Sequence, residues 1–341
     1  MSTPPFRIAV VGAGAIAVDA HLPVWAGRPD VEVAYVVDSD LARAEQAANL
    51  VGAHAASDLS AVLGEGNIDA VDICTPPHLH SSMIEQALDA GAHVLVEKPL
   101  AATLEEARQL ASLQKRSDRI VMVAENWLFS SARTDAERAV AQAELGRPFL
   151  VKAWHESSLY IPEEGLVPAW TFSPTQAQGG YLMQAGIHTL SLLNALVGQV
   201  AEVYAYVDEP TPEVGVPLDR TAVLGLQFEH GAMGSAVLTG RSRREGPRRL
   251  GMELYYDEGV VTLDVWSGAV TCTVRGQTKT VTSDITSMGF REEIDHFVSC
   301  MRTGAEPITS PSRIIPSLES VFAAYSSAAT GRPVRPESVG R

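Results

Sequence analysis

The stretch "GGYLMQAGIHTLSLL" (residues 179–193) carries one histidine, His188, in an otherwise apolar run. Gln184 lies four residues earlier, so on a helix the two side chains share a face. Histidine titrates closest to neutral pH of all side chains and is therefore suited to proton transfer. His188 is either a satisfied core residue or a proton-transfer group, and this stretch alone does not decide between them.

A second candidate for proton chemistry is Lys98 in "HVLVEKPLAAT" (residues 93–103), where an apolar run leads into Glu97, Lys98 and Pro99. Ligands of open α/β sheets bind beyond the carboxyl ends of the strands. Burial at such an edge favours the neutral amine, which suits a general acid or base. Pro99 restricts the backbone of the residue before it to extended geometry. The alternative is a solvated lysine paired with Glu97.

A glycine-rich turn, "GAGAIA" (residues 12–17), follows the apolar, β-branched run of residues 6–12. It fits the G-x-G-x-x-[G/A] pattern, in which the glycines allow a tight turn and a close approach to a pyrophosphate. The N-terminus of the next helix then supplies free N–H groups. We therefore expect a dinucleotide to be bound by Gly12, Ala13, Gly14, Ala15 and Ile16.

Asp38 ends the second predicted strand, 21 residues after Ala17 (38 − 17). A carboxylate at this place accepts hydrogen bonds from the ribose hydroxyls of NAD and repels the 2′-phosphate of NADP. Ser39 and Asp40 follow it, and with no arginine expected nearby NAD is favoured over NADP as the cofactor. The alternative is an Asp38 that only caps the helix after it.

These side chains need a parallel sheet to position them. Apolar segments at residues 6–12, 31–38, 69–76, 93–99 and 120–126 read as buried strands. Helical patterns lie between them, with Gly52 and Gly91 as stop signals and Thr103 with Glu106 as a capping box. Strands alternating with helices predict a doubly wound α/β domain.

The composition narrows the class of protein. The chain has 341 residues, 46% hydrophobic and 20% charged, with a formal net charge of −15. The negative charge argues against nucleic-acid or anionic-membrane partners. Three scattered cysteines, and histidines without ligand-like spacing, predict neither a disulfide framework nor a metal site. We expect a cytoplasmic protein that binds a small-molecule substrate.

Several segments, in this order and spacing, resemble the glucose–fructose oxidoreductase / inositol dehydrogenase / MocA (Gfo/Idh/MocA) family. They are "AVVGAGAIA", "DICTPPHLH", "GAHVLVEKPLA" and "GGYLMQAGIH", and further matches such as "LGRPFLVKAW" and "FREEIDHFVSCMRTGAEP" extend the resemblance over essentially the whole chain. The Glu-Lys-Pro placement is its most specific element.

The resemblance implies a two-domain NAD(P)-dependent enzyme that acts on sugars, cyclitols or related polyols. Residues 1–125 would form the NAD-binding Rossmann domain, and residues 126–341 an α+β domain for substrate binding and oligomerisation. A large, mainly antiparallel sheet in the second domain would form the interface of a homodimer or homotetramer. Strand-like segments at residues 148–156, 202–207, 221–229, 232–240, 249–257 and 259–265 agree with such a sheet.

The resemblance also implies roles for single residues. Lys98 matches the catalytic lysine, and the cofactor would further contact Thr75, Pro76, His80 and Glu97. The family's D-x-G-x-H helix signature places an aspartate where this chain has Gln184. An amide orients ligands through hydrogen bonds but does not titrate, so proton transfer would fall to Lys98 and His188. The other residues expected to contact the substrate are Asn126, His155, Tyr160 and Trp170.

Three functions follow from this reading. The first is a dehydrogenase with a lysine–histidine relay that moves hydride between nicotinamide and a secondary alcohol or ketone. The second is a redox-neutral elimination or epimerisation that uses NAD transiently. The third is a non-catalytic protein that binds NAD or another ligand. Five arginines between residues 241 and 249 could bind an acidic substrate or a second subunit.

Overall fold

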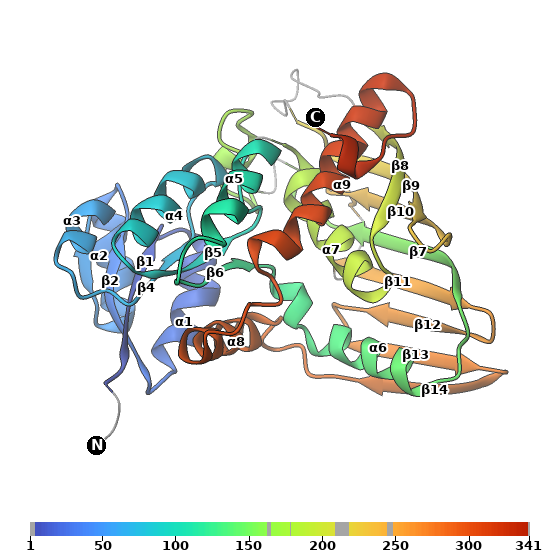
Figure 1. The fold of residues 1–341 in the computed structure, drawn as a ribbon, viewed down its shortest axis with the longest axis horizontal. Helices are drawn as coiled ribbons and strands as arrows, with labels where there is room; N and C mark the ends of the chain where they lie inside the picture. Colours follow the sequence, from blue (N-terminus) through green and yellow to red (C-terminus); the bar gives the residue numbers. More distant parts are fainter. Residues whose placement is uncertain (1–3, 162–164, 178, 209–217, 244–247, 340–341) are drawn as a thin grey trace. The chain divides into compact units, whose positions relative to one another are not determined.

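The described residues of the computed structural model are 4–161, 165–177, 179–208, 218–243 and 248–339. They form two compact units, which Figure 1 shows in the colours of the sequence. The first unit comprises Met1–Ala124 and Phe290–Arg313, and the second comprises Glu125–Gly289 and Ile314–Arg341. The main chain passes from one unit to the other at residues 124/125, 289/290 and 313/314.

The first unit is built on a six-stranded parallel sheet with the strand order β3-β2-β1-β4-β5-β6. The order reverses between β1 and β4, which is where ligands of doubly wound sheets bind. β4 and β6 are buried along their whole length, as expected when helices cover both faces. The strands are β1 (Phe6–Val11), β2 (Val31–Val37), β3 (His54–Ala56), β4 (Ala70–Ile73), β5 (His93–Glu97) and β6 (Val121–Ala124).

The helix signals predicted at Thr103 and Gly52 are confirmed. Thr103 and Glu106 form both hydrogen bonds of a capping box, and Gly52 ends its helix with a φ of 71°. A π-helical turn, Ala17–His21, precedes α1. The helices are α1 (Leu22–Ala26), α2 (Leu41–Val51), α3 (Leu59–Gly64), α4 (His80–Asp89), α5 (Leu104–Gln114) and α8 (Phe290–Thr303).

Helix α8 returns to the first unit from far along the sequence. Its Phe297 is fully buried and meets the ring of Trp25 edge-on, with centroids 6.3 Å apart. The main chain after it also joins the unit, because Val123 donates to the carbonyl of Thr309. The expected division after residue 125 assigned this helix to the C-terminal domain, and in the structure it packs with the first unit.

The second unit holds an eight-stranded sheet with the order β14-β13-β12-β11-β7-β10-β9-β8. Only β7 and β10 pair in parallel, and the other neighbours are antiparallel. The strands are β7 (Pro148–Glu156), β8 (Val200–Val207), β9 (Thr221–Phe228), β10 (Met233–Thr239), β11 (Arg249–Tyr256), β12 (Gly259–Asp264), β13 (Ala269–Val274) and β14 (Gln277–Thr282). The sequence analysis did not anticipate β13 and β14.

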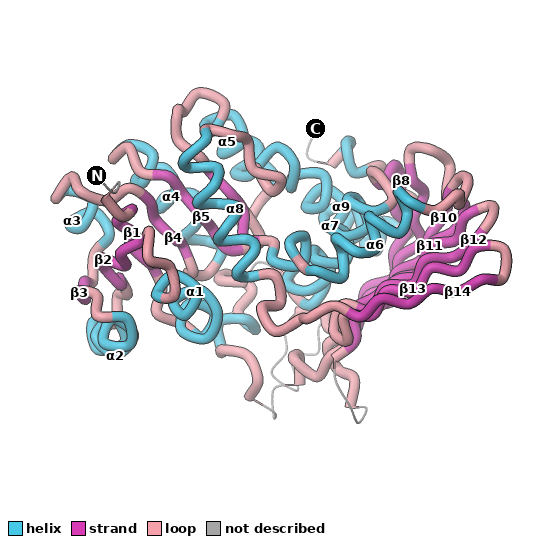
Figure 2. Tube along the Cα trace, turned by 90° about the horizontal axis from the view of Figure 1, so that it is seen from below, coloured by secondary structure: helices cyan, strands magenta, loops and turns pink. Residues whose placement is uncertain are grey.

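Helices cover one face of this sheet, as Figure 2 shows. They are α6 (Ser131–Gln142), α7 (Ile187–Leu196) and the greater part of α9 (Pro311–Thr330). On the other face, neighbouring strands expose a group of large apolar side chains: Tyr206, Val223, Met233 and Val237. Val223 is paired with Tyr206 on one side and with Val237 on the other, so these three side chains form one continuous patch.

The fold class expected from the sequence is confirmed: a doubly wound Rossmann sheet, followed by an α+β unit with a large, mainly antiparallel sheet. Among the helices in the described ranges, none combines the length and the apolar character that crossing a bilayer requires.

Candidate active site

The glycine-rich turn follows β1 directly, as predicted. Gly12 has a φ of 94°, and a Cβ on it would lie 2.7 Å from the carbonyl oxygen of Cys74, so only glycine fits. A Cβ on Gly14 would meet nothing within 4 Å. The helix begins at Ala15. Gly12 therefore packs tightly against the backbone that follows β4, whereas the space beside Gly14 is free for a ligand.

Asp38 lies at the end of β2 and holds this turn in place. Its Oδ2 accepts a hydrogen bond from the backbone of Ala13 at 2.9 Å, and its Oδ1 accepts from the backbone of Asp40 at 2.9 Å. Asp40 is the N-cap of α2, since its side chain accepts from the backbone of Ala42 and Arg43. The alternative in which Asp38 caps this helix is therefore wrong.

An arginine does lie beside Asp38, contrary to the sequence analysis. Arg43 Nη2 is 2.9 Å from Asp38 Oδ1, and Arg43 Nε is 3.4 Å from Asp40 Oδ2. Arg43 lies in the first turn of α2, and the helix turns its side chain back towards the end of β2. The five-residue separation from Asp38 in the sequence gives no sign of this contact. The argument against NADP consequently rests on the Asp38 carboxylate and not on the absence of a cation.

Thr75, Pro76 and His80 follow β4. His80 is fully buried, and its two ring nitrogens lie 2.8 Å from the Thr75 carbonyl oxygen and 3.0 Å from that of Pro99. Burial lowers the pKa of His80 below its usual value, although the backbone oxygens act in the opposite direction. A neutral imidazole donates one hydrogen bond at most. The neutral ring therefore donates to only one of the two carbonyl oxygens while lying between the loops that follow β4 and β5. A contact of His80 with the cofactor remains a prediction.

Glu97 ends β5 and Lys98 follows it, as expected. Glu97 is buried, while Lys98 is partly exposed. The backbone N–H of Lys98 donates to Glu97 Oε2 at 3.1 Å. The Glu97 carboxylate is therefore engaged with the main chain of the lysine.

In the second unit, Gln184 lies in a π-helical turn, Leu182–Gly186, that leads into α7. π-Helical turns inside helices are frequent at functional sites. The Gln184 side-chain amide donates to the carbonyl oxygen of Ala177 at 3.1 Å. One part of this side chain thus holds the segment that precedes the helix.

His188 lies in the first turn of α7 and is hydrogen-bonded through Nδ1 to the carboxylate of Glu125. Both side chains are buried, with residue exposures of 8% for His188 and 1% for Glu125. The sequence analysis missed Glu125, although the segment that contains it had been noted as a strand end. A carboxylate on Nδ1 orients an imidazole and stabilises its protonated form.

Three of the expected substrate residues form an aromatic cluster with Tyr181. The His155 ring lies 5.5 Å from that of Tyr181 and 6.5 Å from that of His188, measured between centroids. Tyr160 meets Tyr181 edge-on at 5.3 Å. The Tyr160 hydroxyl is buried and has no hydrogen-bond partner among the described residues. The fold therefore brings His155, Tyr160 and His188 together.

The two remaining substrate candidates are Asn126 and Trp170. Asn126 is buried and donates its amide to the Met288 carbonyl oxygen at 2.8 Å, so its side chain fixes a turn. Trp170 is partly exposed in a short 3-10 turn, Ala169–Phe172. Their contacts with a substrate remain predictions.

Several arginines of the cluster near residue 245 have partners within the chain. Arg241 pairs with Asp208 and Arg249 with Glu156, both at 3.5 Å. The guanidinium of Arg248 lies over the ring of Trp266. Arg244 lies outside the described residues.

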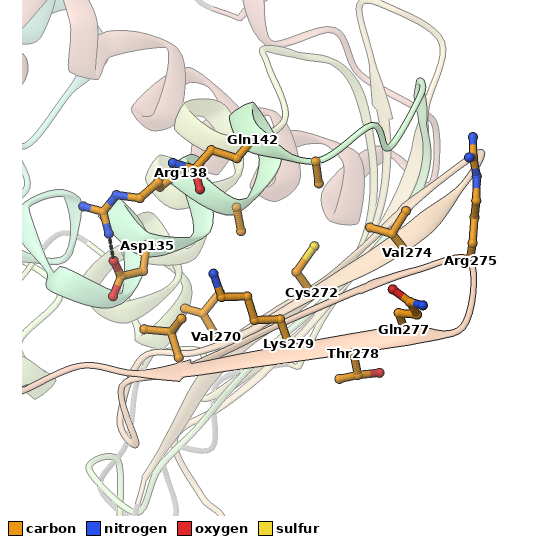
Figure 3. A pocket seen from close by; sticks show the side chains of 13 residues that line it. Asp135, Arg138, Gln142, Val270, Cys272, Val274, Arg275, Gln277, Thr278 and Lys279 are labelled. Atoms are coloured by element: carbon orange, nitrogen blue, oxygen red, sulfur yellow. Dashed lines mark hydrogen bonds and ion pairs between the residues drawn. The ribbon is translucent and has the colours of Figure 1, made fainter.

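A cavity of about 740 Å³ lies elsewhere in the second unit, between α6 and the β13–β14 hairpin (Figure 3). Its wall contains the ion pair of Asp135 and Arg138 on α6, together with Cys272 and Lys279 on the strands. None of the predicted site residues belongs to its lining. This cavity is therefore not a candidate for the chemistry.

Comparison with known proteins identifies the class to which this chain belongs. Residues 6–125 match the model of an oxidoreductase family with an NAD-binding Rossmann fold, and residues 134–262 match the GFO/IDH/MocA C-terminal domain. Scyllo-inositol 2-dehydrogenase (NAD(+)) of Bacillus subtilis is 28% identical over 340 residues, covering 96% of each chain. The dTDP-3,4-didehydro-2,6-dideoxy-alpha-D-glucose 3-reductase of Streptomyces violaceoruber is 32% identical over 260 residues, covering 76% of this chain and 72% of that one.

Among solved structures, GenD2 from gentamicin A biosynthesis in complex with NAD superposes with a TM-score of 0.86. It is 26% identical, and the match covers 98% of this chain and 97% of that one. The expected family is thus confirmed by sequence models for both domains and by the fold. This chain belongs to the GFO/IDH/MocA oxidoreductase family and carries that family's NAD-binding Rossmann domain.

Proposed function

We propose that this protein transfers hydride between NAD and a secondary alcohol or ketone of a sugar-like or cyclitol-like substrate. The observation that carries the proposal is the buried Glu125–His188 pair. This chain lacks the aspartate of the helix signature, yet the neighbouring histidine retains a carboxylate partner. Similarity to an inositol dehydrogenase and to a reductase of a nucleotide-linked sugar supports the substrate class.

The residues of the first unit fit a dinucleotide. Gly14 leaves open space at the start of a helical run, where backbone N–H groups would donate hydrogen bonds to a pyrophosphate. Asp38 lies at the end of β2, where a ribose is bound in this fold. When bound, NAD supplies the hydride acceptor or donor.

The protons are handled by this chain's own side chains. Oxidation of a secondary carbinol removes a hydride from carbon and a proton from oxygen. Lys98 takes that proton through Nζ and returns it in the reverse direction. His188 is its partner in the relay, and the carboxylate of Glu125 holds the ring through Nδ1. Gln184 orients the substrate through its amide.

NAD is the proposed cofactor in preference to NADP. The support is the Asp38 carboxylate, which would face a 2′-phosphate with like charge. Arg43 weakens this preference because it lies on the same carboxylate.

The test is a spectrophotometric screen of inositols, sugars and uronic acids, with NAD and NADP in parallel. The proposal predicts one molecule of NADH for each molecule of product, and loss of turnover in Lys98→Ala by a factor on the order of 10² or more. Substrate conversion without a net change in NADH would identify the redox-neutral alternative. Binding without conversion of any substrate would identify a non-catalytic protein.

We also propose that the sheet of the second unit forms the interface of a homodimer or homotetramer. The patch of Tyr206, Val223 and Val237 supports this, because three large apolar side chains lie together on one exposed face. Analytical ultracentrifugation of the wild type and of Val237→Lys is the test. The variant should shift the chain towards a smaller species, and an unchanged sedimentation coefficient would contradict the proposed interface.

A further inference from the structure

A buried polar cluster lies beneath the carboxyl ends of β4 and β5 in the first unit. It contains His21, Asp72 and Cys74, joined by the indole of Trp25 and the carboxylate of Glu97. His21 and Asp72 are completely inaccessible to solvent. Burying charged groups costs free energy unless they are paired, so the arrangement calls for an explanation.

The hydrogen bonds form a continuous path that ends at Lys98. Asp72 Oδ2 accepts from Trp25 Nε1 at 2.7 Å and lies 2.8 Å from His21 Nδ1. The opposite ring nitrogen, His21 Nε2, lies 3.2 Å from Glu97 Oε1. The other oxygen of Glu97, Oε2, accepts from the backbone N–H of Lys98. The path therefore runs from Asp72 through His21 to Glu97, and from Glu97 to the backbone of Lys98.

The two carboxylates beside His21 indicate which protonation state of its imidazole completes the path. A neutral imidazole donates from one nitrogen only, whereas the protonated ring donates to both carboxylates. Burial opposes protonation, but Asp72 and Cys74 together outweigh it and raise the pKa of His21 well above its usual value. Burial, together with Asp72, raises the pKa of Cys74 to about 12, so its thiol stays protonated and donates to Asp72 Oδ1.

His21 is the last residue of a π-helical turn and is completely buried. Phe290 on α8 packs against its ring, with the centroids 5.7 Å apart. Glu293, three residues further along α8, is a second buried carboxylate of that helix. The two ring nitrogens of His21 face carboxylates, Nδ1 that of Asp72 and Nε2 that of Glu97.

His21, Asp72 and Cys74 also offer ligand atoms within 4.8 Å of one another, which is close enough for a metal ion. The hydrogen bonds favour the metal-free interpretation. Asp72 is already an acceptor for the indole, the imidazole and the thiol. A metal would have to displace His21 Nδ1 from Asp72 and deprotonate a thiol whose pKa is raised.

We propose that His21 and Asp72 are positioning residues for Lys98. Asp72 orients His21, and His21 contacts the Glu97 carboxylate. That carboxylate in turn accepts a hydrogen bond from the backbone of Lys98 and so fixes the main chain that carries the lysine. This inference rests on the role of Lys98 in the proposed function. It explains why a cation and two carboxylates are buried beneath the end of β5.

The test is a double-mutant cycle on the full-length protein with NAD. His21→Gln removes the cation, and Asp72→Asn keeps the shape of the side chain but removes its charge. Each should lower kcat by about tenfold to a hundredfold, the scale of a misplaced reacting group, with the KM for NAD near that of the wild type. In a Lys98→Ala background neither change should lower the residual rate further. His93→Gln, at the opposite end of β5, is the control and should retain wild-type kcat.

Three results would overturn the inference. An equal loss of kcat with and without Lys98 indicates a purely structural role, and wild-type kcat in both His21→Gln and Asp72→Asn removes any role. Stoichiometric zinc in the isolated protein, lost in Cys74→Ser, indicates a metal site instead. If Lys98→Ala itself keeps wild-type turnover, the proposed function of Lys98 fails, which this cycle detects separately. If His21→Gln does not fold, as judged by circular dichroism, Asp72→Asn decides the question.

Discussion

Glu125 and His188 form a buried carboxylate–imidazole pair although 63 positions separate them in the sequence. Glu125 is the first residue of the second unit, and His188 lies at the start of α7 in the same unit. His188 therefore has a carboxylate partner from outside its own helix, although the position four residues earlier is Gln184 and not an aspartate.

Removing the charge of Glu125 tests this pair. Glu125→Gln keeps the size of the side chain but removes the carboxylate that holds Nδ1 of His188, so we expect kcat to fall by a factor on the order of 10² while the dissociation constant of NAD stays constant. The control is Glu137→Gln, which removes a more exposed ion pair with Arg133 on α6. Steady-state kinetics and NAD titration measure both. A fall in NAD affinity with unchanged kcat would contradict the assignment.

Gln184→Asp tests whether the glutamine is a specificity element. The amide donates to the Ala177 carbonyl, and a carboxylate in its place would meet that oxygen with like charge. We expect activity on the native substrate to be abolished, and Gln184→Glu, which keeps the length, to lose activity as well. Higher turnover of simple polyols by Gln184→Asp would instead mark the glutamine as a weakened acid position.

The choice of cofactor should depend on Asp38 and Arg43 together. Asp38→Ser releases Arg43 from its ion pair and removes the charge that repels a 2′-phosphate. We expect NAD to bind about tenfold more weakly, or about 1.4 kcal/mol, and NADP to become an acceptable cofactor. In the double variant Asp38→Ser/Arg43→Ala, the affinity for NADP should fall below that of Asp38→Ser, because no arginine remains to bind the 2′-phosphate. Equal NADP affinity in the single and double variants would show that Arg43 takes no part.

The two glycines of the turn should respond differently to alanine. Gly12→Ala forces a Cβ against the Cys74 carbonyl at a positive φ, and we expect a loss of stability of about 1–3 kcal/mol. Gly14→Ala has open space, so the melting temperature should hold while NAD affinity falls, since the methyl group occupies the place of the pyrophosphate. Thermal unfolding and NAD titration distinguish the two. A destabilised Gly14→Ala variant would contradict this account of the turn.

The buried His21 should leave a signature in the pH dependence of stability. Its pKa is raised above 6.5 in the folded protein, against burial and through Asp72. Protonation therefore contributes stability that is complete below pH 6.5 and is lost as the pH rises through the folded pKa. The difference in free energy of unfolding between the wild type and His21→Gln should shrink above pH 6.5, by up to about 1.4 kcal/mol per pH unit. Urea titrations at several pH values measure it, and a constant difference would rule out this titration.

Local signals in the sequence predicted the first unit well. The strand-end lysine, the turn at Gly12, the capping box at Thr103 and the stop at Gly52 all depend on neighbouring residues. The class of the second sheet was implied by the family resemblance, and strand-like segments, several of which alternate apolar and polar residues, agreed with it. Its last two strands were missed: β14 is exposed throughout and carries no such pattern.

Contacts between distant parts of the chain could not be predicted in the same way. His21 meets Asp72 across 51 positions, and Glu125 meets His188 across 63. No periodicity connects such pairs, since His21 and His188 lie on helical segments and only the folded chain brings them to Asp72 on β4 and to Glu125 after β6. The position of Arg43 could have been predicted. Asp40 is a typical N-cap residue, and Arg43 follows it within the first turn of the helix, which brings the arginine back towards Asp38.

The return of residues 290–313 to the first unit has a consequence for engineering. A fragment that stops at residue 124 omits α8 and leaves the indole of Trp25 without its partner Phe297. Exchanging the nucleotide-binding half between relatives therefore requires two separate stretches of gene, with junctions near residues 124, 290 and 313. A chimaera with a single crossover would combine a Rossmann sheet from one parent with a covering helix from another.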